Sequence, residues 1–187
     1  MDEGQFCSVP VAHGPLPGKR FRDTNFGWWR KRFQRQFELV DILRLDHFRA
    51  LAGYWRVKGD AKTAINGSWI NSPGRKLLNN LKKDLKTNFL PIIAEDLGVI
   101  TPDVDKLRKN FELPGMKILQ FAFDGNEDNP YLPKNIAGEN WVVYTGTHDN
   151  STSVSWWEYL DYESKKRIKD EYKFSENPSW DLIEIGM

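Results

Sequence analysis

The stretch Leu39–Tyr54, LVDILRLDHFRALAGY, decides the fold and the chemistry of this 187-residue sequence. Apolar residues dominate it up to Leu45, and a short apolar run of this kind is typical of a strand buried on both faces of a parallel sheet. The run presents Arg44, Asp46 and His47 at its end. Because parallel barrels carry their active sites at the carboxyl ends of their strands, we expect these three residues to belong to a site.

Helical and strand patterns alternate along the rest of the chain. A long polar connection follows Tyr54 and is of the kind that builds walls over a site. The patterns predict, in order, a helix from Asp23 to about Val40, the opening strand, a helix over 77–85, a strand at Phe89–Ala94, a helix opened by Thr101 and Pro102, strands at Ile118–Phe123 and Trp141–Tyr144, and a helical stretch to about Tyr172.

This order predicts an α/β fold built from parallel βαβ units. A closed eight-unit (β/α)8 barrel of the TIM type needs about 250 residues, and four strands cannot close one. The chain is therefore either a portion of such a barrel, about four βα units, or a small open sheet. Residues 1–22, with their spaced glycines and prolines, are predicted to be an irregular segment, and residues 23–187 a partial catalytic barrel domain.

Composition argues against several classes of partner. The formal net charge is +1, so no broad electrostatic field recruits nucleic acid or an anionic membrane. The sequence has no apolar run long enough to span a bilayer. Cys7 is the single cysteine, which points to a reducing compartment, and we expect a cytoplasmic protein.

Two carboxylates at strand ends suggest glycoside chemistry. Retaining cleavage needs two carboxyl groups about 5 to 5.5 Å apart, one as nucleophile and one as acid and base. Asp46 and Glu95 each follow a predicted strand. Arg44 projects from the same face as Asp46 and would favour its ionised form, whereas Ala94 and Leu97 beside Glu95 would raise its pKa by partial burial.

Asp149 follows the fourth predicted strand, Trp141–Tyr144, and would be a third carboxylate at the site. Each acid also has a structural alternative: an ion pair of Asp46 with Arg44, a loop pair of Glu95 with Asp96, or a helix cap at Asp149. Three acids at three strand ends favour the catalytic interpretation.

Four blocks, RLDHFRAL, LPIIAEDLGVITPDV, LPGMKILQFAFD and VVYTGTHDN, resemble successive blocks of the amylomaltase family, the 4-α-glucanotransferases or disproportionating enzymes related to α-amylases. The resemblance covers about Phe26 to Trp157. It implies a retaining enzyme that transfers α-1,4-glucan segments between maltodextrins. It further implies these roles: nucleophile Asp46, acid/base Glu95, transition-state stabiliser Asp149, and substrate-binding residues Arg44, His47, Asp96 and His148.

Neither a cofactor nor a metal is predicted. No glycine-rich phosphate loop follows a strand, and the acidic run Asp124–Asp128 lacks the glycine and the closing acid of a calcium loop. The expected partners are α-1,4-glucans and maltooligosaccharides, with no nucleic acid and no membrane. The alternatives are an α-glucan hydrolase and a catalytically inert glucan-binding remnant, and a plastid is the alternative compartment.

Overall fold

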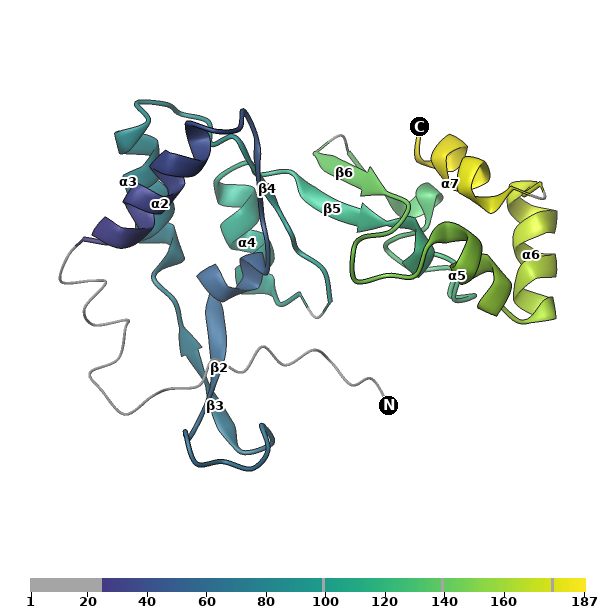
Figure 1. Cartoon of the computed structure of the whole chain (residues 1–187), viewed down its shortest axis with the longest axis horizontal. Helices are drawn as coiled ribbons and strands as arrows, with labels where there is room; N and C mark the ends of the chain where they lie inside the picture. Colours follow the sequence, from purple (N-terminus) through teal and green to yellow (C-terminus); the bar gives the residue numbers. More distant parts are fainter. Residues whose placement is uncertain (1–24, 99, 139, 176) are drawn as a thin grey trace. The chain divides into compact units, whose positions relative to one another are not determined.

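The structure, a computed structural model, describes residues 25–187 except 99, 139 and 176 (Figure 1). The predicted irregular segment 1–22 lies outside the described residues. The chain divides into two compact units, the first ending at Gly115 and the second beginning at Met116. A single catalytic domain over residues 23–187 stays a prediction.

A short parallel sheet positions the site in the first unit. Strands β1 (Leu43–Leu45) and β4 (Ile92–Ala94) pair in parallel. Helices α2 (Gly27–Phe37), α3 (Gly74–Asp84) and α4 (Pro102–Asn110) complete this α/β arrangement. The described residues form no closed barrel, since each of their sheets has two strands.

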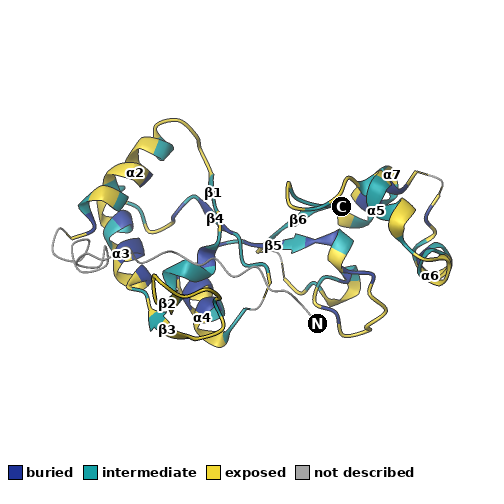
Figure 2. Ribbon diagram, turned by 60° about the horizontal axis from the view of Figure 1, so that its bottom comes forward, coloured by how far each residue is buried: buried dark blue, intermediate teal, exposed yellow. Residues whose placement is uncertain are grey.

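Leucines on one stripe of α3 explain how the first unit is held together. Leu77, Leu78 and Leu81 recur at helical spacing and are buried against Phe33 of α2 and Ile92 of β4 in one apolar cluster. Figure 2 shows the buried positions along α3, whereas Phe33 is the one buried residue among the described residues of α2.

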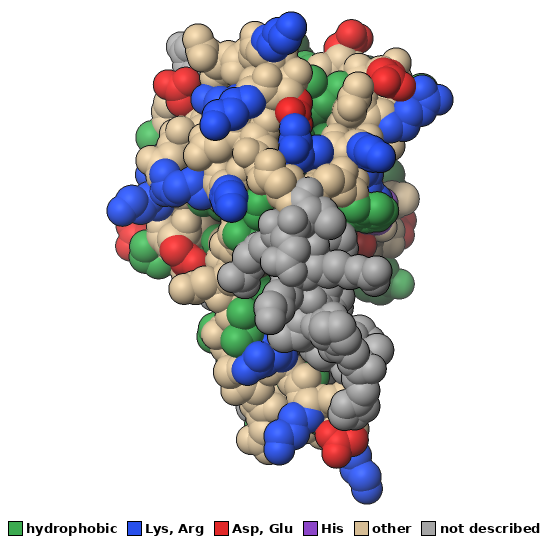
Figure 3. All heavy atoms as spheres, turned by 90° about the vertical axis from the view of Figure 1, so that its left-hand side faces the viewer, with side chains coloured by type: hydrophobic (Ala, Val, Ile, Leu, Met, Phe, Trp, Pro, Cys, Tyr) green, Lys and Arg blue, Asp and Glu red, His purple; other side chains and the backbone are tan. Residues whose placement is uncertain are grey.

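The exposed side of these helices is charged. Figure 3 shows Lys and Arg side chains on the α2–α3 side scattered among Asp and Glu. The Arg30 Nε donates a hydrogen bond to Asp84 Oδ2 at 2.6 Å, which ties α2 to α3. This face is therefore no single-sign surface. No helix within the described ranges is long and apolar enough to cross a bilayer.

The opening strand is shorter and less covered than the sequence predicts. Pairing is confined to Leu43–Leu45, and Leu39 and Ile42 are each 60% exposed. The expectation of a strand buried on both faces is wrong for these residues. α2 ends at Phe37, so residues 38–42 form a turn and bend, and within the described part of the unit only β4 pairs with β1.

The connection after Tyr54 is an antiparallel hairpin rather than an irregular loop. Its strands are β2 (Gly53–Val57) and β3 (Gly67–Asn71). Trp55 and Trp69 are direct partners across it, with ring centroids 5.5 Å apart. Such cross-strand aromatic pairs stabilise hairpins. The sequence prediction considered the polar residues of this connection and therefore did not identify the hairpin.

The described residues of the second unit form three α-helices and a two-stranded sheet, whose first strand begins at Gly115, the last residue of the first unit. Strand β5 (Gly115–Ile118) pairs with β6 (Trp141–Tyr144), and 3-10 turns η2 (Leu119–Phe121) and η3 (Pro133–Asn135) lie between them. The helices are α5 (Ser153–Tyr159), α6 (Tyr162–Tyr172) and α7 (Pro178–Gly186). The predicted strand Ile118–Phe123 is wrong beyond Ile118, because Leu119 and Ala122 enter the buried cluster of this unit from a turn.

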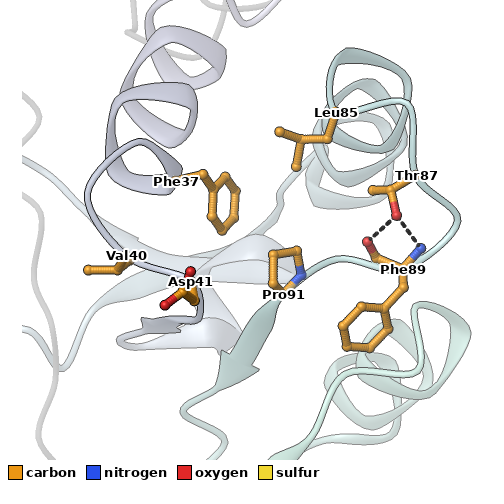
Figure 4. Close-up of a pocket in the computed structure, with 7 residues that line it drawn as sticks. All are labelled: Phe37, Val40, Asp41, Leu85, Thr87, Phe89 and Pro91. Carbon is orange, nitrogen blue, oxygen red and sulfur yellow. Dashed lines mark hydrogen bonds between the residues drawn. The ribbon is translucent and has the colours of Figure 1, made fainter.

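A hollow lies at the amino ends of β1 and β4 (Figure 4). Five of its lining residues are apolar, and Asp41 and Thr87 are polar: the set is Phe37, Val40, Asp41, Leu85, Thr87, Phe89 and Pro91. The Thr87 hydroxyl donates to the Phe89 carbonyl at 2.9 Å and accepts from the Phe89 N–H at 3.1 Å, which fixes one side. Asp46 and Glu95 follow the opposite ends of these strands, so this hollow is not the candidate site.

Candidate active site

The register of the parallel sheet brings two predicted catalytic acids to the same edge. Leu45 and Ala94 are register partners, and Asp46 and Glu95 are the residues that follow them. The Glu95 N–H donates to the Leu45 carbonyl at 3.0 Å, and the Glu95 carbonyl accepts from the Phe48 N–H at 3.0 Å. The backbone of Glu95 is therefore fixed on both sides by the segment that carries Asp46.

The Glu95 carboxylate is held by two backbone amides. Its Oε2 accepts from the His47 N–H at 2.7 Å, and its Oε1 accepts from the Leu97 N–H at 3.3 Å. His47 has φ 48° and ψ 51°, in the left-handed region that few non-glycine residues adopt. This backbone conformation belongs to the turn that aims the His47 amide at Glu95.

Burial raises the pKa of Glu95 above its ordinary value and is the largest influence on it. The amides of His47 and Leu97 lower the pKa, the nearby Asp46 charge raises it, and Arg44 lowers it. The net direction agrees with the expectation from the apolar sequence around Glu95. A raised pKa suits a group that must deliver a proton at neutral pH.

Asp46 is open to solvent and has a fixed cationic neighbour. Its side chain is 68% exposed, and its Oδ1 lies 2.9 Å from the Arg44 Nη2 in an ion pair. The exposed Asp46 carboxylate is accessible to a substrate from solvent, and the Arg44 guanidinium orients this carboxylate. This geometry meets the steric requirement of a nucleophile.

The Asp96 side chain is buried in the first unit. It is 7% exposed, and its Oδ2 lies 3.1 Å from the Nε of Arg108 on α4, whose side chain is 4% exposed. The prediction that Asp96 binds glucan stays a prediction, and its side chain is already engaged inside the first unit.

The remaining predicted residues, His148 and Asp149, lie in the second unit after β6. Both side chains are exposed, and His148 Nε2 lies 3.4 Å from Asp149 Oδ2. Asn150 Oδ1 accepts from the Thr147 N–H at 2.8 Å and from its hydroxyl at 2.9 Å. The loop that presents His148 and Asp149 is thus internally braced.

Arg49 is a candidate supporting residue that the sequence reasoning missed. Its guanidinium lies 4.4 Å above the Trp69 ring of β3, and its Nη2 donates to the Thr101 hydroxyl at 3.3 Å, just before α4. It sits in the 3-10 turn η1 (Phe48–Leu51), directly after the Asp46 strand end. Arg49 therefore connects η1 to β3 and to the residue that precedes α4. No local sequence motif predicts such a role.

We expect the pKa of Glu95 to respond in opposite directions to the loss of its two charged neighbours. Asp46→Asn removes a charge that raises this pKa and should lower it, whereas Arg44→Gln removes a charge that lowers it and should raise it. Carbon-13 NMR of the Glu95 carboxyl during a pH titration measures both. Arg56→Gln, an exposed charge change on β2, should leave the titration unchanged, and shifts of one common sign in the two site variants would contradict the described geometry.

Comparison with known proteins adds the family. A family model described as 4-alpha-glucanotransferase matches residues 3–186. The chain is 46% identical to the 4-alpha-glucanotransferase of Synechocystis over 98% of its own length and 36% of that protein. It is 44% identical to the chloroplastic/amyloplastic enzyme of Arabidopsis thaliana, over 99% of the chain and 31% of that protein.

Solved structures of amylomaltases are also similar to this chain. The amylomaltase of Streptococcus agalactiae in complex with acarbose superposes with a TM-score of 0.81 at 34% identity, covering 90% of this chain and 34% of that one. The amylomaltase of Corynebacterium glutamicum, at 19% identity and a TM-score of 0.63, shows the fold alone. The chain spans about a third of the length of the curated relatives it matches. Over almost its whole length, this chain belongs to the 4-alpha-glucanotransferase family.

Proposed function

We propose that the protein is a retaining 4-α-glucanotransferase, which moves α-1,4-glucan segments between maltooligosaccharides. The observation that carries this proposal is the parallel register of β1 and β4, which sets Asp46 and Glu95 side by side at one sheet edge. Family membership supports it. We further infer that β1, β4, β5 and β6 are strands of a (β/α)8 barrel, an inference supported by the likeness to an amylomaltase structure.

Asp46 is the nucleophile of the proposed reaction. Its carboxylate attacks the anomeric carbon as the glycosidic bond breaks, and a glucosyl ester of Asp46 forms. Arg44, 2.9 Å away, holds the attacking carboxylate in place. Glu95 in its protonated form gives its proton to the departing glucan oxygen, so the leaving group departs as a neutral alcohol.

The second half of the reaction reverses the proton transfer. Glu95, now ionised, takes the proton from the 4-hydroxyl of an acceptor glucan, and that oxygen attacks the ester and releases Asp46. The two amides on the Glu95 carboxylate keep it in place through both steps. Asp149 is proposed to stabilise the oxocarbenium-like transition state, and His47 and His148 to bind sugar hydroxyls.

A maltotriose assay tests this proposal. The purified chain, shown to be folded by circular dichroism, should convert maltotriose to glucose together with maltodextrins longer than maltotriose. Glucose and maltose alone would identify a hydrolase, because water rather than a sugar would then have released the ester. A folded sample that forms no product would contradict the proposal for this chain.

The proposed setting follows from the family. The substrates are α-1,4-glucans, and the S. agalactiae amylomaltase was solved with acarbose, which makes acarbose a suitable probe. The compartment is proposed to be the cytoplasm or a plastid, since the name of the Arabidopsis relative places that protein in the chloroplast and amyloplast.

A further inference from the structure

A buried ion pair lies behind the proposed acid/base residue. The Arg108 guanidinium contacts Asp96 through its Nε at 3.1 Å, as an ion pair rather than a well-aligned hydrogen bond. Its Nη1 donates to the Leu113 carbonyl at 3.0 Å, and its Nη2 donates to Asp105 Oδ1 at 3.3 Å. Arg108 thus joins the residue after Glu95 to α4 and to the segment that follows this helix.

Arg108 is placed here by its helix. Val104 and Leu107 of α4 are buried in the apolar cluster of the first unit, the cluster that also holds Leu77, Leu78 and Leu81 of α3. Arg108 lies one helical turn after Val104 on the same side of α4. Burying a charge is costly unless it is paired, and removing one partner of a buried pair leaves the other charge buried without compensation. Asp96 and Arg108 therefore depend on each other, and the pair resists any movement that would separate them.

The carboxylates of Glu95 and Asp96 have different partners, which separates the roles of these two residues. The Glu95 carboxylate meets the His47 and Leu97 amides, and the Asp96 carboxylate meets α4. The Glu95 backbone is already bonded to Leu45 and Phe48. The Asp96 side chain adds a further anchor, to Arg108 of α4, at the next residue of the same segment.

We propose that Asp96 and Arg108 are positioning residues, whose buried pair fixes Glu95 for proton transfer, and that Asp96 does not contact the glucan. This inference rests on the proposed function. It predicts that losing either partner loosens Glu95 and slows the proton-transfer steps without weakening glucan binding. A misplacement of about 1 Å costs on the order of 10²-fold in rate.

Four variants test the pair: Asp96→Asn, Arg108→Gln, their double variant, and Lys109→Gln as the control. Lys109 is the next residue on α4 and forms an exposed ion pair with Asp105 at 2.7 Å, so its loss changes the same charge without touching Asp96. With maltotriose, Asp96→Asn and Arg108→Gln should each lower kcat roughly 10- to 100-fold with KM within about 2-fold. Lys109→Gln should leave both constants unchanged.

A second measurement needs no enzymatic activity. The charges acting on the pKa of Glu95 come from Asp46 and Arg44. If Asp96 and Arg108 acted on Glu95 only through charge, Asp96→Asn would lower its pKa and Arg108→Gln would raise it. Loosening instead admits water to Glu95 in both variants, so NMR titration should show both shifts downward. The double variant should shift no further than either single one.

The outcomes separate the two proposals. An increase in KM at constant kcat for Asp96→Asn, with no change for Arg108→Gln, would identify Asp96 as a glucan ligand and overturn the inference. Opposite shifts of the Glu95 titration would also overturn it. If the unsubstituted chain shows no transfer while both variants move the titration downward, the proposed function fails and the positioning pair stands. Should Asp96→Asn not fold, Arg108→Lys, which keeps the charge but loses the guanidinium fork, takes its place.

Discussion

Replacing Asp46 by Asn should lower the rate of glucan transfer by about 10⁴-fold or more, because the amide cannot form the glucosyl ester on which both half-reactions depend. The substitution preserves shape and removes the charge that pairs with Arg44 at 2.9 Å. Product formation from maltotriose, followed by chromatography of the maltodextrins, measures the loss. Asp41→Asn is the matched control, since Asp41 is exposed and lies before the amino end of β1, beside the hollow of Figure 4.

Glu95→Gln should differ from Asp46→Asn in its dependence on the leaving group. Acid catalysis contributes about 10²- to 10⁴-fold when the departing oxygen needs a proton, and nothing when it does not. With α-glucosyl fluoride as donor, Glu95→Gln should therefore still form the Asp46 ester, measured as fluoride release. Asp46→Asn should release none above background. Equal losses with both donors would assign Glu95 a role other than the acid.

Elements with strong local signals agree most closely with the sequence. β6 has the predicted bounds, Trp141–Tyr144, and α4 begins with Pro102 at its first position, as the Thr101–Pro102 pair indicates. The apolar run that follows β5 favours a strand in the sequence but forms a 3-10 turn in the structure. Residues 119–123 are as apolar as a strand, yet they enter a core from a 3-10 turn, and apolarity alone does not separate these cases.

The sequence places the candidate acids Asp46 and Glu95 after two strands, and the parallel register of β1 and β4 has them there. How the side chains are held was less predictable. Strand ends located Asp46 and Glu95, but the Glu95 carboxylate is bound by the backbone of His47 in a left-handed conformation. No side-chain pattern encodes that bond. The burial of Arg108 could have been predicted from the sequence. Arg108 lies on the same face of α4 as the buried Val104, and a buried arginine needs an acidic partner.

Replacing Phe48 by Ala should lower the free energy of unfolding by about 3 to 5 kcal/mol, the usual cost of truncating a fully buried phenylalanine. Phe48 is 0% exposed in the first apolar cluster, and its N–H donates to the Glu95 carbonyl. The residue thus joins the core to the turn that links the two proposed catalytic acids. Urea unfolding followed by tryptophan fluorescence measures the change.

Phe89→Ala makes the same chemical change where little apolar area is buried. Phe89 is 55% exposed at the hollow before β4, so we expect a loss of about 1 kcal/mol or less. Because the Phe48 N–H is bonded to the Glu95 carbonyl, truncation of Phe48 should also slow transfer under conditions where the variant remains folded, whereas Phe89→Ala should not. Equal stability losses would mean that Phe48 does not anchor this core. A large stability loss with full transfer activity would show that the Phe48 side chain is not needed to hold Glu95 in place.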